Sequence, residues 1–216
     1  QDLKFGMFIH WGTYSQLGVI ESWTICPELT EWEYKGRPEG MTYMEYLRFY
    51  EHLKDTFNPI HFDPDKWAEA AEYAGMKYVV FTTKHHDGFN MFDTNLTDYK
   101  VTDEGCPFHS NPRSNIAKEV FNSFRAKGLK AGAYFSIADW HNNDYWWKFF
   151  SPKDRYINYD PARWPEKMTS FEDYVESQVR ELTNGDYGKI DLMWLDLCEI
   201  SETYENHFPW GRIADA

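Results

Sequence analysis

Four short stretches of this sequence end on side chains that could bind or cleave a small polar molecule. His10 ends an apolar stretch near the start of the chain, and a second stretch runs directly into His85 and His86. A third stretch carries Tyr134 near its end, and a fourth ends on Asp196. Imidazole, phenol and carboxylate groups can hydrogen-bond hydroxyls, and a carboxylate can also attack an electrophilic carbon. These stretch ends are the first candidates for a functional site.

Asp196 ends the apolar stretch at residues 189–196. Side chains alternate between the two faces of a strand, so Trp194 and Asp196 would share a face with Ile190 and Leu192. In a parallel β/α barrel the catalytic groups lie at the carboxyl ends of the strands, where Asp196 would stand. The pattern favours a sugar-cleaving nucleophile at Asp196, and a carboxylate that only caps the next loop is the alternative.

The adjacent residues His85 and His86 raise the question of a metal site. Neighbouring residues of a strand point to opposite faces, so such a pair chelates a single ion poorly. Histidine ligands are better placed two residues apart in a strand or four apart in a helix. We therefore predict no metal here, and we expect one ring to face the site while the other lies in the core or directly behind the site-facing groups.

Alternating and β-branched patterns predict the strands that would carry these residues. The predicted strands are residues 4–11, 77–82, 129–136 and 189–196. Predicted helices lie between them at about residues 42–54, 63–75, 115–127 and 170–184. Asp63 and Ser170 are the expected N-caps of two of these helices, with Pro64 at the first position of the former. Its apolar face is predicted to comprise Trp67, Ala70, Ala71 and Ala74.

The connections between these elements are asymmetric. Links from helix to strand are short and contain Gly, whereas links from strand to helix are long and rich in His, Trp, Tyr and acids. A (β/α)8, or TIM, barrel keeps its site in the strand-to-helix loops, and about four β/α units are present. An open half barrel would leave sheet edges and one apolar face unpaired. We therefore expect residues 1–216 to be the N-terminal half of a single catalytic barrel domain.

A smaller open α/β sheet is the structural alternative. No Gly-rich phosphate loop follows any predicted strand, which argues against nucleotide-binding versions and gives no reason to expect a cofactor. The three cysteines have no CxxC spacing, so neither a disulfide framework nor a zinc finger is predicted. The first strand begins almost at residue 1, so we expect a trimmed chain in which a signal peptide cannot be seen.

Composition narrows the class of ligand. Aromatic residues make up 19% of the 216 residues, which is typical of proteins that stack rings against flat apolar faces such as those of sugars. The formal net charge of -13 argues against nucleic acid and anionic membranes as partners. No window of 18 apolar residues is present, so no membrane span is predicted.

Two loops are candidates to line a pocket. Glu31 and Trp32 lie in the first long loop, where a solvated acid beside a packed indole is the alternative. Residues 137–169 form the most aromatic part of the chain, and much of that segment could be a satellite core under a long loop.

Several motifs in this chain resemble those of the α-L-fucosidases of glycoside hydrolase family 29. They are FGMFIHWG (5–12), Glu31-Trp32, FNP (57–59), FD (62–63), Trp67, AGMKY (74–78), KHHDGF (84–89) and WLD (194–196). The resemblance implies a (β/α)8-like domain that removes terminal α-L-fucose with retention, through two carboxylates about 5–5.5 Å apart. It also implies a substrate that is a fucosylated oligosaccharide or glycoconjugate, and a location that is secreted, periplasmic or lysosomal.

The resemblance also assigns roles to residues. Asp196 matches the nucleophile, and the sugar-binding positions are matched by His10, Glu31, Trp32, His85, His86, Tyr134 and Trp194. The family usually has Gly after the nucleophile, whereas Leu197 and then Cys198 follow here. Glu199 is too close in sequence to match the acid/base residue, which stays unassigned. We expect these 216 residues alone to be inactive.

Two other functions stay open from the sequence. A fucose-binding pseudoenzyme would keep the histidines and aromatic rings, while the altered turn at Leu197 disables attack. A barrel hydrolase specific for another sugar would share the same site, and comparing fucosides with galactosides would separate it from a fucosidase.

Overall fold

The computed structural model describes residues 3–27, 38–200 and 209–215. Its centre is a four-stranded parallel sheet in which spatial order follows chain order. The strands are β1 (Met7–Ile9), β2 (Tyr78–Lys84), β3 (Lys130–Ser136) and β4 (Leu192–Asp196). The four predicted strands are therefore confirmed, although β1 is shorter than predicted. Parallel strands in this order are what successive β/α units produce.

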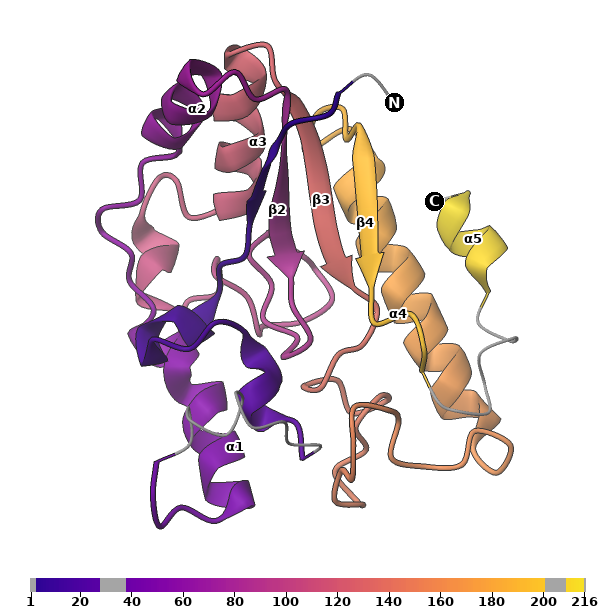
Figure 1. The fold of residues 1–216 in the computed structure, drawn as a ribbon. Helices are drawn as coiled ribbons and strands as arrows, with labels where there is room; N and C mark the ends of the chain where they lie inside the picture. Colours follow the sequence, from indigo (N-terminus) through magenta and orange to yellow (C-terminus); the bar gives the residue numbers. More distant parts are fainter. Residues whose placement is uncertain (1–2, 28–37, 201–208, 216) are drawn as a thin grey trace.

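Three helices cover one face of the sheet (Figure 1). They are α2 (Pro64–Tyr73), α3 (Ile116–Ala126) and α4 (Pro165–Thr183). The carboxyl ends of all four strands point toward α1 (Tyr43–Glu51) and the long connecting segments. Short 3₁₀ helices at Thr13–Leu17, Ser22–Ile25, His52–Thr56 and Pro107–Ser110 and the helix α5 (Trp210–Ala214) complete the described elements.

Local sequence signals explain where most helices begin. Thr42 and Glu45 form a reciprocal capping box at the start of α1, and Asp63 caps α2 with Pro64 at its first position, as predicted. The predicted start of α4 at Ser170 is wrong, because the helix begins five residues earlier at Pro165. The Ser170 hydroxyl instead donates a hydrogen bond to the Asp144 carboxylate at 2.6 Å.

The predicted apolar face of α2 also needs correction. Ala71 is buried and Trp67 is partly buried, but Ala70 and Ala74 are exposed and Ala68 is buried instead. The helix is thus rotated by part of a turn relative to the predicted stripe. Among the described residues, no helix is both long enough and apolar enough to cross a membrane.

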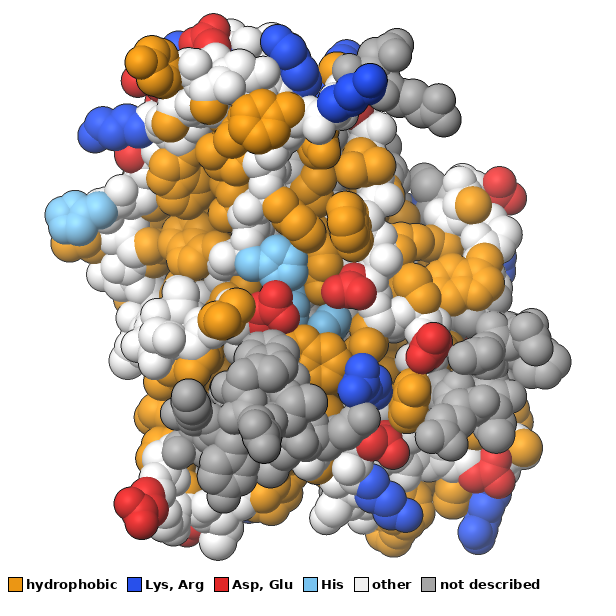
Figure 2. Space-filling model, in the orientation of Figure 1, with side chains coloured by type: hydrophobic (Ala, Val, Ile, Leu, Met, Phe, Trp, Pro, Cys, Tyr) orange, Lys and Arg blue, Asp and Glu red, His pale blue; other side chains and the backbone are white. Residues whose placement is uncertain are grey.

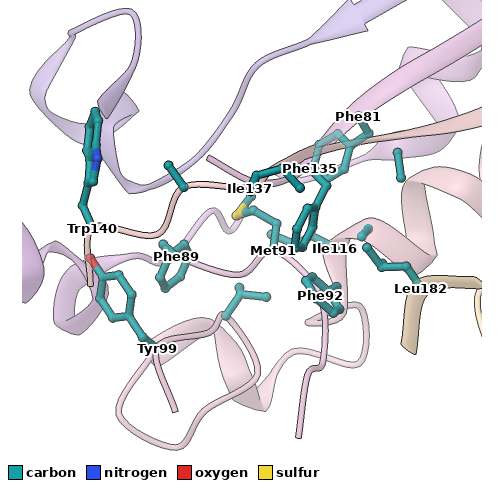
Figure 3. Close-up of a cluster of buried hydrophobic side chains, with 14 of the residues drawn as sticks. Phe81, Phe89, Met91, Phe92, Tyr99, Ile116, Phe135, Ile137, Trp140 and Leu182 are labelled. Atoms are coloured by element: carbon teal, nitrogen blue, oxygen red, sulfur yellow. The ribbon is translucent and has the colours of Figure 1, made fainter. Parts of the chain in front are cut away.

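The main core lies between the sheet and the covering helices. Phe81 of β2 and Phe135 of β3 point toward the helices, where Ile116 and Leu182 meet them, as Figure 3 shows. Phe81 makes an edge-to-face contact with Phe121 of α3 at 6.5 Å between ring centroids. Since one face of each strand is used in this packing, the alternate residues must face the other side.

That other side, the inner face of the sheet, carries exposed apolar rings. Phe8 contacts Trp194 at 5.0 Å and Tyr134 at 5.8 Å between ring centroids. Even so, Phe8 is 45% exposed and Trp194 is 47% exposed. Figure 2 shows hydrophobic side chains over this face, with histidine and acidic side chains gathered at its centre. The expectation of an unpaired apolar face is therefore confirmed.

Candidate functional site at the strand ends

Tyr134 and Asp196 meet at the carboxyl ends of β3 and β4. The sheet register pairs Tyr134 with Trp194 and Ser136 with Asp196, so these side chains share the inner face. The Tyr134 hydroxyl donates a hydrogen bond to Asp196 Oδ2 at 2.6 Å. Burial, together with the charge of Asp196 and this hydrogen bond, raises the pKa of Tyr134 far above its ordinary value. The phenol therefore remains a proton donor to the carboxylate.

The residue after Asp196 has an unusual backbone conformation. Leu197 has φ +47°, and it is the only non-glycine residue with positive φ in the part of the chain that the structure describes. A β-carbon makes this region costly, by about 1 kcal/mol or more. The Leu197 N–H donates to Asp196 Oδ1 at 2.8 Å. Leu197 thus adopts the turn conformation that Gly would adopt without strain. Both oxygens of Asp196 accept hydrogen bonds, one from Leu197 and one from Tyr134.

The expectation that the rings of His85 and His86 point to opposite faces of the strand is wrong, because the two rings lie in contact with each other. The register of β2 against β3 shifts between Thr82 and Lys84, and β2 then ends. A bulge of this kind re-aims the side chains that follow it. The two imidazole rings consequently lie with their centroids only 4.0 Å apart, and their exposed fractions are 2% and 1%.

His86 lies between the nucleophile candidate and two indoles. Its Nε2 atom is 3.9 Å from Asp196 Oδ2, and its ring contacts Trp23 and Trp140 at 4.9 and 5.2 Å between centroids. Burial lowers the pKa of His86 to about 3, with further lowering from His10 and nearby cations. His86 is therefore a neutral imidazole at any pH where the protein is expected to work.

His10 and His85 share a carboxylate that the sequence analysis missed. Glu21 places Oε1 3.3 Å from His10 Nδ1 and Oε2 3.8 Å from His85 Nε2. The next residue, Ser22, lies with Oγ 2.5 Å from His85 Nδ1. Burial lowers the pKa of His85 well below its usual value, and His85 Nε2 has no hydrogen-bond partner among the described residues. A ligand hydroxyl would supply that partner.

The sequence shows residues of the right type here, but it does not show that the folded loop brings them to the site. Glu21 and Trp23 form an acid and indole pair 11 and 13 residues after His10, of the same kind as Glu31-Trp32. Only the later pair was predicted to line the pocket. Glu31 and Trp32 lie outside the described residues, so their role stays a prediction.

The group His10, Glu21 and His85 could also hold a metal ion. Their ligand atoms lie within 4.8 Å of one another, and two imidazoles with one carboxylate suit transition metals. The prediction of no metal rested on the His85 and His86 pair alone, and this group of three residues was not predicted. The same side chains also suit a sugar, because the two imidazoles and the carboxylate can each form a hydrogen bond to one of several neighbouring hydroxyls.

A buried ionic layer supports the end of β2 from behind. Lys84 is fully buried, and its Nζ donates to Asp139 Oδ2 and to Gln178 Oε1, both at 3.2 Å. Asp139 Oδ1 also accepts the backbone N–H groups of His141 and Asn142. Burial lowers the pKa of Lys84, and the charge of Asp139 opposes that shift.

The turn after His86 fits closely against this layer. Burial raises the pKa of Asp87 to about 6, and the Tyr50 hydroxyl donates to Asp87 Oδ2 at 2.7 Å. Gly88 has φ +79°, and a Cβ there would collide with the Asp139 carboxylate. Only Gly combines this backbone conformation with this approach, which explains the glycine of the KHHDGF motif.

The aromatic segment after β3 is mainly a packed core, the alternative that the sequence left open. Trp140, Tyr145 and Trp146 are buried, and Trp140 stacks on Trp146 at 5.0 Å between centroids. The Trp140 backbone N–H donates to the His86 carbonyl at 2.8 Å, which ties the segment to the site. Arg155 from the same segment places its guanidinium 4.8 Å from the Trp23 ring centroid.

The site thus presents a carboxylate held by a phenol and an amide, beside three imidazoles and several aromatic rings. Such groups at the carboxyl ends of parallel β/α strands suit a small polar ligand that has an apolar side. Comparison with known proteins gives the family.

The model of the family described as "Alpha-L-fucosidase" matches residues 1–214. Human plasma α-L-fucosidase is 28% identical over 207 residues, which are 88% of this chain and 40% of that protein. α-L-Fucosidase isoenzyme 1 from Paenibacillus thiaminolyticus is 40% identical with a TM-score of 0.65, covering 89% of this chain and 40% of that one. A family 29 α-L-fucosidase from Bacteroides thetaiotaomicron, trapped as a covalent intermediate with 2-fluoro-fucosyl fluoride, is 28% identical with a TM-score of 0.65, covering 90% and 39%.

The chain belongs to the α-L-fucosidase family, glycoside hydrolase family 29. Its four parallel β/α units are part of the (β/α)8 barrel of that family. The chain spans about 40% of the length of the human plasma enzyme.

Proposed function

We propose that this chain is the N-terminal part of the catalytic barrel of a retaining exo-α-L-fucosidase. The observation that carries the proposal is the environment of Asp196, which stands at the end of β4 with both oxygens held by hydrogen bonds. A carboxylate oriented in this way can attack the anomeric carbon of a sugar seated against the histidines. The chain matches about 40% of the human plasma enzyme and about 40% of the Paenibacillus isoenzyme, which supports a site completed by further barrel units.

In the proposed reaction, Asp196 forms a bond to the anomeric carbon as the bond from that carbon to the leaving oxygen breaks. A second carboxyl group, about 5–5.5 Å away in retaining enzymes, protonates the leaving oxygen and later activates water. We assign no residue of this chain to that second role. His10, His85 and His86 would bind the sugar hydroxyls, Tyr134 would hold Asp196, and Trp194 would pack against the apolar side of the sugar.

The substrate that we propose is a terminal α-L-fucoside on an oligosaccharide or glycoconjugate. The trapped intermediate described for the Bacteroides relative supports a double displacement, and the net charge of -13 supports a neutral sugar rather than a polyanion. Substrates of this kind occur outside cells, in the periplasm and in lysosomes, so we place the enzyme in one of these compartments.

The experiment that tests this function is covalent trapping. The protein that contains this chain is incubated with 2-deoxy-2-fluoro-fucosyl fluoride, digested and mapped by mass spectrometry. We expect the added mass on Asp196, because the fluorine slows hydrolysis of the glycosyl-enzyme. Reversible fucose binding with no label on Asp196 would favour the fucose-binding pseudoenzyme, and turnover of galactosides but not fucosides would favour the other hydrolase.

A further inference from the structure

Ser136 connects His86 to the backbone behind it. It is the last residue of β3, is fully buried and pairs in register with Asp196. Its Oγ lies 2.7 Å from His86 Nδ1 and 2.7 Å from the carbonyl oxygen of Ala138. Because Tyr134 and Ser136 are two residues apart on one strand, they share the inner face, and each holds one polar group of the site.

The Ser136 hydroxyl has one proton to share between these two neighbours. A carbonyl oxygen can only accept, so the hydroxyl proton must point to Ala138. Ser136 Oγ can then only accept at its other contact, which requires a proton on His86 Nδ1. If Nδ1 were bare, two lone pairs would face each other at 2.7 Å in a buried site.

We infer that Ser136 is a positioning residue that fixes His86 as the Nδ1–H tautomer, leaving Nε2 as a bare hydrogen-bond acceptor in the sugar pocket. In free histidine the proton can occupy either ring nitrogen, and the tautomer in a protein is set by the partner of the other nitrogen.

This tautomer has a consequence for substrate recognition, which rests on the proposed function. His86 Nε2 lies 3.9 Å from Asp196 Oδ2, so two acceptors border the same part of the pocket. A sugar group placed there must bring its own proton. A hydroxyl can donate one, whereas a fluorine or a methoxy group at that carbon cannot. Ser136 therefore makes the site selective for a free hydroxyl at one position of the sugar.

The first test uses nuclear magnetic resonance on the whole protein labelled with ¹⁵N-histidine. The His86 signals are assigned by their loss in His86→Gln, and the spectrum is recorded at pH 7. We expect a protonated Nδ1 and an unprotonated Nε2 for His86. A protonated Nε2 in the unsubstituted protein would overturn the inference. This readout needs no turnover, so failure of the tautomer and failure of the fucosidase assignment give different results.

The second test compares variants. Ser136→Ala should move the His86 proton toward Nε2 and lower kcat/KM on 4-nitrophenyl α-L-fucoside about tenfold or more, because a buried partner is lost. Ser136→Thr retains the hydroxyl and should restore the Nδ1–H signal. Thr83→Val is the matched control: it removes a buried hydroxyl that donates to the Tyr134 carbonyl but touches no imidazole. It should lower stability without changing the tautomer.

The third test identifies the hydroxyl. With a series of monodeoxy 4-nitrophenyl α-L-fucosides, one position should lose the most activity in the unsubstituted enzyme. In Ser136→Ala that loss should shrink severalfold, because a protonated His86 Nε2 no longer needs a hydroxyl that donates a hydrogen bond to it. An equal loss at that position in both enzymes, with the tautomer unchanged, would show that Ser136 only packs.

Discussion

The ends of β2 and β4 form opposite sides of one site, yet they are built differently. The β2 end is enclosed: Lys84, His85 and His86 are at most 2% exposed and are braced by hydrogen bonds from three directions. The β4 end is open: the Asp196 side chain is 44% exposed, and Trp194 beside it is nearly half exposed. The enclosed side is suited to recognise a rigid ligand by hydrogen bonds. The open side carries the group that is proposed to react with that ligand.

The two strand ends are therefore expected to contribute differently, one to selecting the ligand and the other to reacting with it. Preorganised groups in a dry pocket determine which ligand fits, because their hydrogen bonds have no competing water. A reactive carboxylate needs access to the ligand and a fixed direction, and Tyr134 and the Leu197 amide provide that direction by binding one oxygen each. Substitutions at the two ends should therefore have different signatures, in turnover at β4 and in stability at β2.

The largest effect is expected on turnover, from a substitution at the open end of β4. Asp196→Asn removes the proposed nucleophile while keeping the acceptor for Tyr134, and should lower kcat on 4-nitrophenyl α-L-fucoside by about 10³-fold or more. Asp191→Asn, at the other end of the same strand segment, is the control and should lose less than about threefold. Asp191 forms ion pairs with Lys130 and Lys189 far from the strand's carboxyl end. Equal losses in the two variants would remove Asp196 from the chemistry.

The next largest effect is expected on stability, from a substitution at the enclosed end of β2. Lys84→Met leaves the buried Asp139 carboxylate without its cation and should lower the free energy of unfolding by about 3 kcal/mol. Lys130→Met, at the half-exposed beginning of β3, should change it by less than about 0.5 kcal/mol. The midpoint of thermal unfolding, measured for both variants, checks this. Similar midpoints would mean that the buried pair does not brace β2.

The dependence of stability on pH should sharpen the same comparison. Burial lowers the pKa of His86 to about 3, so between pH 4 and 6 the unfolded chain binds more protons there and stability rises with pH. Burial raises the pKa of Asp87 to about 6, so the folded chain binds more protons there and stability falls with pH over the same range. The two neighbours should largely cancel.

Asp87→Asn removes one of these opposing slopes while keeping an acceptor for the Tyr50 hydroxyl. Stability of the variant should then rise by about 2 kcal/mol more than that of the unsubstituted protein between pH 4 and 6. Asp98→Asn, on an exposed side chain, is the control and should leave the slope unchanged. Thermal midpoints at several pH values measure both slopes, and parallel curves for Asp87→Asn would contradict the assignment.

The smallest effect is expected from restoring glycine after Asp196. Leu197 already adopts positive φ and donates its amide to Asp196, so Leu197→Gly should change kcat/KM by less than about threefold. Relief of backbone strain, about 1 kcal/mol, would be offset by loss of the packed Leu side chain. Steady-state kinetics checks this. A gain of more than tenfold would show that Leu197 holds the carboxylate in an unreactive position.

The sequence predicted much of this architecture for identifiable reasons. Four alternating strands, the Asp63 cap and the meeting of Tyr134 with Asp196 follow from period-two patterns and parallel strand topology, which are local or general rules. The contact between the His85 and His86 rings could not be predicted in this way. It depends on a shift in strand register between Thr82 and Lys84, and the pattern of residue types does not reveal that shift.

The errors elsewhere have the same origin. Ser170 looks like a cap, but its hydroxyl is used by Asp144, a partner 26 residues away. Glu21 was missed because only the folded loop brings it between His10 and His85. Contacts between residues distant in sequence decided these cases, and single-sequence patterns do not contain them.

The register shift in β2 also limits how this stretch can change during evolution. Thr83 is the extra residue of this shift, because Thr82 pairs with Tyr134 and Lys84 with the next residue, Phe135. Deleting Thr83 would remove the bulge and the local bend that re-aims the side chains after it. The contact of Lys84 with Asp139 and the close fit of Gly88 beside that carboxylate both depend on this local geometry. Single substitutions here change one contact, whereas a one-residue gap changes all of them. Related sequences should therefore keep the length of the segment between positions 81 and 88 constant and keep Gly at position 88.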